Sequence, residues 1–89
     1  DTIKQAYLGY QKINTLGLKM LNPGGYLITF SCSGNMTADL FLEMLKNASR
    51  KAKKQVQLIE YRMQTKDHPM LLANMDTLYL KCAVIRVCE

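Results

Sequence analysis

A short apolar segment between two chain breakers constrains the fold of this sequence more than any other feature. The segment Tyr26–Cys32 is rich in aromatic and β-branched residues, which favours a strand. The preceding run Asn22-Pro23-Gly24-Gly25 ends any helix that comes before it. Because the centre of the strand is apolar on both faces, the pattern predicts a buried strand of a parallel sheet with helices on both sides.

Apolar residues spaced three and four positions apart predict two helices. The first covers residues 2–21 and contains Gly9 and Gly17, whose small size favours close packing on a sheet. The second covers residues 38–53, after an N-cap at Thr37. The faces expected to be buried are Ile3, Ala6, Tyr7, Tyr10, Ile13, Asn14, Gly17 and Leu21 in the first helix, and Leu40, Phe41, Met44, Leu45, Ala48 and Ala52 in the second.

Two further strands are predicted after the second helix, over residues 56–63 and 77–88, with a loop over 65–76 between them. The order helix, strand, helix, strand, strand is typical of an α/β fold, and the last two strands can pair antiparallel. Two helices are too few to cover both faces of such a sheet. Since the chain also starts at Asp1 instead of Met, we expect it to be part of a longer protein.

Composition and cysteine usage exclude several classes of protein. The 89 residues are enough for one small domain, and 48% hydrophobic with 21% charged residues is a globular balance. No apolar run approaches the roughly 18 residues of a membrane span. Cys32, Cys82 and Cys88 form no CxxC pair, which excludes a complete disulfide framework and a four-cysteine zinc site. This usage favours a reducing, cytoplasmic compartment.

The net charge of +5 is moderately basic, and the run Arg50–Lys54 holds four cations in five positions. Such a cluster can neutralise RNA phosphates. It is equally typical of a solvated helix end, where cations complement the helix dipole, and we favour that interpretation. His68 is the only histidine, and with no second ligand at a useful spacing we expect no metal site.

Several segments together resemble one bacterial enzyme family. They are Gly9–Asn14, Leu21–Gly34, Met36-Thr37, Asp67-His68-Pro69 and Tyr79-Leu80-Lys81, of which Thr29–Ser33 is the most specific. With these segments, nearly the whole chain resembles the carboxyl-terminal part of class I S-adenosylmethionine-dependent methyltransferases that form 5-methylcytosine in large-subunit ribosomal RNA.

The resemblance implies a fold and a place in a larger protein. Residues 1–89 would be a carboxyl-terminal fragment of the catalytic domain, with the last three strands of its Rossmann-like sheet and an antiparallel final pair. The family's glycine-rich cofactor loop, ribose-binding acidic residue and Asp-Pro-Pro motif would all precede Asp1. S-adenosylmethionine would therefore bind mainly to the absent amino-terminal part. The substrate would be a cytosine of 23S ribosomal RNA, and the fragment alone would be inactive.

Cys32 is the candidate catalytic nucleophile. It follows a predicted strand at its carboxyl end, where open α/β sheets place their sites. A thiolate that adds to carbon 6 of cytosine makes carbon 5 nucleophilic, and cysteine suits this covalent catalysis. The alternative from position alone is a buried structural thiol. The resemblance favours the nucleophile, because related RNA cytosine methyltransferases place their attacking cysteine after the matching strand.

Four further residues are candidates for substrate binding. Ser31, Ser33 and Gly34 are small neighbours of Cys32 that would let a base approach and hydrogen-bond to it. His68 could contact RNA or act as a base, although a histidine beside Pro69 more often shapes a turn. Cys82 is expected in the core, and Cys88 at a frayed chain end.

Two alternatives remain open from the sequence. The chain could be a stand-alone α/β module that binds RNA or a protein without catalysis, or a methyltransferase of the same family with a changed substrate. In the stand-alone case the first strand would present an exposed apolar edge, which invites pairing with another chain and would be satisfied in a homodimer.

Overall fold

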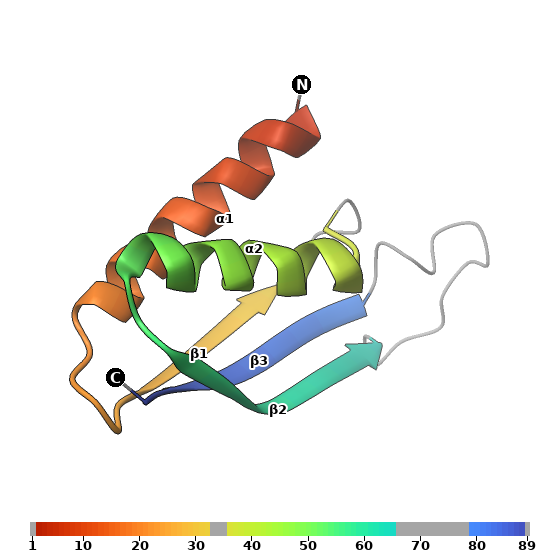
Figure 1. Cartoon of the computed structure of the whole chain (residues 1–89). Coiled ribbons are helices and arrows are strands. Elements are labelled where there is room, and N and C mark those ends of the chain that lie inside the picture. Colours follow the sequence, from red (N-terminus) through yellow and green to blue (C-terminus); the bar gives the residue numbers. More distant parts are fainter. Residues whose placement is uncertain (1, 33–35, 66–78, 89) are drawn as a thin grey trace.

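The computed structural model describes residues 2–32, 36–65 and 79–88 as two helices and three strands (Figure 1). The elements are α1 (Thr2–Lys19), β1 (Tyr26–Ser31), α2 (Ala38–Ala52), β2 (Val56–Thr65) and β3 (Tyr79–Val87). The predicted element order is confirmed, and the ends differ from those predicted by one or two residues. None of the helices in this described part of the chain is long and apolar enough to span a membrane.

The sheet has the strand order β1-β3-β2, with β3 in the centre and antiparallel to both neighbours. The antiparallel relation of the last two strands is therefore confirmed. The prediction of a parallel pairing for β1 is wrong within the described residues, because β1 pairs with the returning strand β3. A register shift between Leu58 and Glu60 interrupts the β2–β3 ladder with one extra residue, Ile59.

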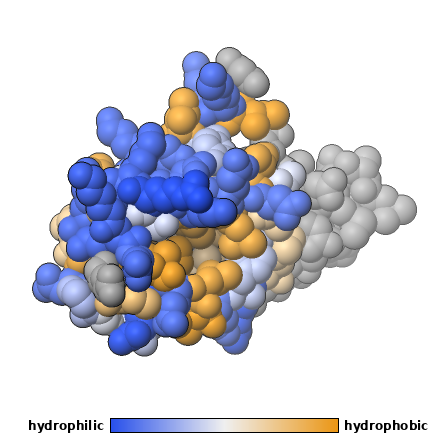
Figure 2. Space-filling model, in the orientation of Figure 1, coloured by the Kyte–Doolittle hydropathy of each residue, from blue (hydrophilic) through white to orange (hydrophobic). Residues whose placement is uncertain are grey.

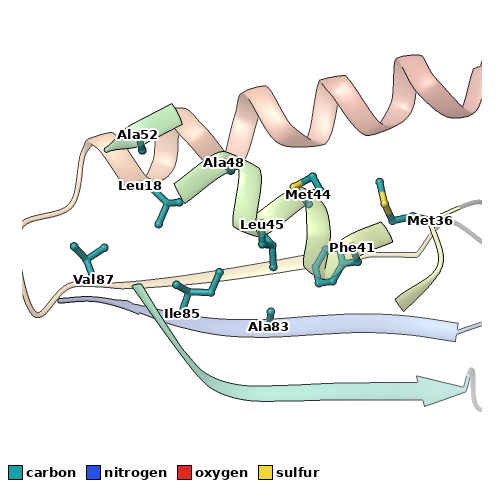
Figure 3. Close-up of a cluster of buried hydrophobic side chains, with 10 residues drawn as sticks. All are labelled: Leu18, Met36, Phe41, Met44, Leu45, Ala48, Ala52, Ala83, Ile85 and Val87. Atoms are coloured by element: carbon teal, nitrogen blue, oxygen red, sulfur yellow. The ribbon is translucent and has the colours of Figure 1, made fainter. Parts of the chain in front are cut away.

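The two helices lie on the same side of the sheet, with α2 between α1 and the strands (Figures 1 and 3). Side chains of α2 point toward β3, as the labelled Phe41 and Leu45 show in Figure 3. All six residues predicted for the buried face of α2 are buried or pack against the core. The fully or nearly buried cluster consists of Leu18, Met36, Phe41, Met44, Leu45, Ala48, Ala52, Ala83, Ile85 and Val87.

Both ends of α2 are capped by hydrogen bonds. The Thr37 hydroxyl accepts from the backbone N–H of Leu40 at 3.2 Å, which confirms the predicted N-cap. At the other end Lys53 adopts a left-handed conformation with φ 57°, and its N–H donates to the carbonyl of Arg50. The Lys54 ammonium donates to the carbonyl of Leu21 at 3.0 Å, so it also ties the end of α2 to the segment after α1.

The buried face of α1 is predicted in part. Asn14 is buried as predicted, and Tyr7 and Tyr10 pack against the core. Ile3 and Ile13 are instead exposed, whereas Gln11, Thr15 and Leu18 are buried, because apolar periodicity counts most polar residues as exposed. These polar residues are accommodated by hydrogen bonds to the helix itself or to α2: the Asn14 amide donates to the Tyr10 carbonyl and to Met44 Sδ, and the Thr15 hydroxyl donates to the Gln11 carbonyl.

Gly17 allows α1 to approach β1. A Cβ added at Gly17 would lie 3.2 Å from Leu27 Cδ1, which is tighter than nine in ten real Cβ contacts. The expectation that a small residue permits close packing holds at this position. It does not hold at Gly9, which has nothing within 4 Å of such a Cβ.

One face of the sheet carries no helix of the described chain. Tyr26, Ile28 and Phe30 of β1 lie on this face and are 55–58% exposed. The prediction that both faces of β1 are buried is therefore wrong for this chain, because both helices cover the other side. Toward β2 the open face becomes polar, with an exposed ion pair of 2.7 Å between Arg62 and Glu60.

Two leucines of α1 provide a matched test of this packing. Leu18 is fully buried, whereas Leu16 is 52% exposed. We expect Leu18→Ala to lower the free energy of unfolding of the 89-residue chain by about 3–5 kcal/mol, because it leaves a cavity. Leu16→Ala should change it by less than about 1 kcal/mol. Denaturant unfolding measures both, and equal losses would contradict the described helix orientation.

Candidate functional site

Cys32 lies just beyond the carboxyl end of β1 and is exposed. Chain positions 33–35 separate it from the buried Met36 and from the N-cap Thr37 that starts α2. The predicted site residues Ser33, Gly34 and His68 lie outside the described residues. An exposed thiol at this end of a strand is accessible to a substrate, which the alternative of a buried structural cysteine would not be.

Ser31, the last residue of β1, is buried and lies on the side of the sheet that carries the helices. Its predicted role in substrate binding stays a prediction. Its position fixes the local register, since Ser31 lies directly opposite Lys81 of the central strand. The residue next to Cys32 is thus anchored to the centre of the sheet.

Lys81 is a charged residue in the interior, with only 3% of its surface exposed. It belongs to the helix-facing row of β3 together with Ala83, Ile85 and Val87. Burial lowers the pKa of Lys81, since a charged ammonium is poorly solvated there, and the negative charge of a Cys32 thiolate acts in the opposite direction and raises it.

Sequence reasoning did not identify Lys81 as a site residue. The available signal was its place in an alternating strand, where positions 81, 83, 85 and 87 share one face and only Lys81 is charged. A lysine in that row either extends its ammonium to solvent or is buried, and Lys81 is buried.

Tyr61 is a second polar residue near this end of the sheet. It lies on β2 opposite Ala83, and its ring packs against Phe41 with the centroids 6.3 Å apart. Its hydroxyl is buried and has no hydrogen-bond partner among the described residues. Burial, and secondarily the charge of Asp39, raise the pKa of Tyr61. Tyr61 of β2 and Asp39 in the first turn of α2 are thus close enough to interact electrostatically.

The other two cysteines lie in different surroundings. Cys82 is half-buried on β3, opposite Phe30 and on the face without helices, so it is not the core residue that the sequence predicted. Cys88 is also half-buried, and its backbone N–H donates to the carbonyl of Gln55 at 2.7 Å. The chain end at Cys88 is therefore held against the segment before β2 and is not frayed there.

The cationic cluster lies at the opposite end of α2 from Cys32. The helix has 15 residues and is about 22 Å long. Arg50 and Lys51 are exposed in its last turn, and the Lys54 ammonium donates a hydrogen bond to the Leu21 carbonyl after α1.

Figure 2 shows a hydrophilic ridge above an apolar hollow on this side of the molecule. A groove of about 520 Å³ lies between α2 and β2, with Leu45, Leu58 and Ile85 among its lining residues.

Comparison with known proteins gives two kinds of match, although no family model matches the chain. Proteins named ribosomal RNA large subunit methyltransferase I from Shewanella frigidimarina and Salmonella arizonae are 48% identical to it over 79 residues. Those residues are 89% of this chain and 20% of each relative. The chain thus spans about a fifth of the length of the curated relatives it matches.

The structural match concerns the fold. A crystal structure described as "SMU.776, a putative methyltransferase complexed with SAH" superposes with a TM-score of 0.61 at 24% identity. The superposition covers 88% of this chain and 20% of the other. The predicted α/β fold class is confirmed: the two helices and the antiparallel three-stranded sheet have the same fold as part of that structure.

The exposure of the three cysteines predicts the order in which they react. We expect Cys32 to be alkylated by iodoacetamide faster than Cys82 and Cys88, because it alone of the three is fully on the surface. Peptide-resolved mass spectrometry after short incubations measures all three rates in one sample. If Cys82 reacts first, the thiol at the end of β1 is not the accessible one.

Proposed function

We propose that this chain is part of an S-adenosylmethionine-dependent methyltransferase that acts on carbon 5 of a cytosine in 23S ribosomal RNA, with Cys32 as the nucleophile. The supporting observation is the exposed thiol at the carboxyl end of β1, inside the matched region. Any stretch of 79 residues in a chain of 89 includes Cys32, so the 48% identity to the two relatives covers it. The proposed reaction would take place in the cytoplasm, where ribosomal RNA is found.

The chemistry explains why an exposed cysteine is needed. The Cys32 thiolate adds to carbon 6 of cytosine, and the electron pair of the bond between carbons 5 and 6 makes carbon 5 a nucleophile. Carbon 5 takes up the methyl group, a base removes the proton from carbon 5, and the restored double bond expels the Cys32 thiolate. The thiol must therefore reach the edge of a flipped base, which a buried cysteine could not do.

The residues described here do not form a cradle for the methyl donor. A glycine-rich turn binds a nucleotide cofactor through free backbone N–H groups after a strand. The pair Gly24-Gly25 instead precedes β1, and Gly24 donates its N–H to the carbonyl of Val87 at 2.7 Å. S-adenosylmethionine supplies an electrophilic methyl group when bound, and we assign its binding to other parts of the protein.

The open face of the sheet is relevant to this assignment. Tyr26, Ile28 and Phe30 are half-exposed, and β1 pairs on one side only within the described residues. A longer polypeptide would cover this face and continue the sheet beyond β1. In the alternative, a stand-alone binding module, a second copy or a partner would cover this face. The observation that favours this alternative is that the exposed apolar residues belong to β1, which lies at the edge of the described sheet.

Replacement of Cys32 tests the proposed chemistry. In the complete protein we expect Cys32→Ala to reduce methylation of 23S ribosomal RNA by at least about a thousandfold, because the covalent step is lost. Mass spectrometry of digested RNA nucleosides identifies the product and its position. Cys82→Ala is the matched control and should retain activity, since Cys82 is half-buried on β3.

A trapping experiment separates the nucleophile from a structural cysteine. RNA with 5-fluorocytidine at the target site has no proton to lose from carbon 5, so the protein should stay covalently attached through Cys32. A full-activity Cys32→Ala variant, or a product other than 5-methylcytosine, would contradict the proposal.

Binding of the methyl donor distinguishes a fragment from a complete enzyme. We expect isothermal calorimetry of the 89-residue chain to detect no binding of S-adenosylmethionine at micromolar concentrations, since the Gly24 N–H is occupied by β3. The complete protein is the positive control. Micromolar binding by the isolated chain would show that its own residues form the cofactor site.

A further inference from the structure

We propose that the helix layer carries a binding surface for the phosphate backbone of RNA, formed by Lys12 and Lys19 of α1 together with Lys51 of α2. These lysines line one groove of about 290 Å³, which we call the interhelical groove. The inference rests on the proposed function and deepens it, because it names a surface away from Cys32 that holds the RNA substrate.

The geometry of the interhelical groove follows from how the two helices end. Lys12 and Lys19 are separated by about two helical turns, so they lie on the same side of α1, about 10 Å apart along its axis. Both helices end on the same side of the molecule (Figure 1), and Lys51 in the last turn of α2 lines the same groove. All three lysines are exposed. Cations from two helices thus surround one hollow.

The charge around the interhelical groove has a single sign. None of the described residues that line it is acidic, and the sequence of α1 contains neither aspartate nor glutamate. The acidic residues of α2 are Asp39 and Glu43, and the nearer of them lies about 12 Å along the axis from Lys51. The one ion pair among the described residues is on β2 and leaves the three lysines of the groove unpaired. Such a surface attracts a polyanion.

The helix dipole explains only part of this arrangement. It favours cations in the last turn of a helix, which accounts for Lys19 and Lys51. For that reason the sequence alone favoured a solvated helix end for the run Arg50–Lys54. Lys12 lies about two turns before the end of α1, where the dipole has little effect, and yet it lines the same groove. A bound phosphate group accounts for all three positions.

The apolar residues of the interhelical groove favour RNA over a lipid surface. Leu8 and Leu16 line it beside the lysines and are 48% and 52% exposed. Helices that lie on lipid separate their apolar and cationic residues onto opposite faces. Here both kinds of residue line one hollow, which suits a chain whose phosphates alternate with less polar sugars.

The distance from Cys32 defines what this surface can contribute. Lys51 lies about 20 Å along α2 from Ala38, the residue that begins the helix closest to Cys32 in the chain. Contacts to phosphates fix the position and direction of a nucleic acid, whereas contacts to bases select the sequence. The interhelical groove therefore orients a long RNA, and the residues around Cys32 select the base.

The test compares two variants of the complete protein that lose the same charge. The groove variant combines Lys12→Gln, Lys19→Gln and Lys51→Gln. The matched variant changes three exposed cations that do not line the interhelical groove, by Lys4→Gln, Lys46→Gln and Arg62→Gln. Fluorescence anisotropy measures the affinity of each protein for a labelled transcript of 23S ribosomal RNA, without methyl donor and at several salt concentrations.

Each lost phosphate contact lowers the slope of log affinity against log salt concentration by about 0.7. We therefore expect the slope of the groove variant to be shallower by about 2, which at about 0.15 M salt is a roughly fiftyfold weaker affinity. The matched variant should lose less than about threefold. Melting temperatures confirm that both variants fold. Should the groove variant unfold, Lys12→Gln and Lys4→Gln alone provide the same comparison, with an expected slope change of about 0.7 for Lys12→Gln.

Equal losses in the two variants would overturn the proposal, since only net charge would then matter. Unchanged RNA affinity in the groove variant would also overturn it, and loss of that variant's binding to phosphatidylglycerol vesicles would then assign the groove to lipid. The outcomes separate this inference from the proposed function. If the wild type binds no 23S ribosomal RNA, the proposed function fails and the inference with it. If it binds and the two variants do not differ, only the inference fails.

Discussion

The pairing of β3 with both other strands is the interaction on which the rest of the structure depends. β1 and β2 do not pair with each other, so without β3 there is no sheet among the described residues. The same strand supplies Ala83, Ile85 and Val87 to the core beneath α2. Its end is bonded to the turn before β1 in both directions, from Gly24 to Val87 and from Val87 to Gly25. The sheet, the hydrophobic core and the strand register next to Cys32 therefore all depend on β3.

The one-sided helix layer follows from how the helices attach to this sheet. α2 buries an apolar face against β3, and α1 then packs mainly on α2 through a partly polar interface. The Asn47 amide donates to the Tyr7 hydroxyl at 2.8 Å, which is another polar contact between the two helices. Stacking both helices on one side leaves Tyr26, Ile28 and Phe30 uncovered. That exposed apolar row supports the proposal that the chain is one part of a longer polypeptide.

Sequence patterns predicted the features that depend on local periodicity. The face of α2, the N-cap at Thr37 and the strand order along the chain all follow from regular spacing and turn chemistry. The burial of Thr15 on α1 was not predicted, because it depends on a specific hydrogen bond from its hydroxyl to the Gln11 carbonyl. For β1 the pattern correctly indicated two apolar faces, but hydrophobicity does not tell which polypeptide covers them. Position 32 was accessible to sequence reasoning through its place after a strand. The alternation of β3 also offered a signal for the burial of Lys81, which became evident with the β1–β3 register.

The alternation of a β-strand explains how a buried and an exposed residue can follow each other at the end of β1. Successive side chains point to opposite faces, so a buried Ser31 is compatible with an exposed Cys32 directly after it. Lys81 is the ladder partner of Ser31 and shares its face, where Ala83, Ile85 and Val87 continue the row. The central strand β3 therefore fixes β1 up to the residue before Cys32, and the same alternation that buries Ser31 turns the Cys32 side chain to the face without helices.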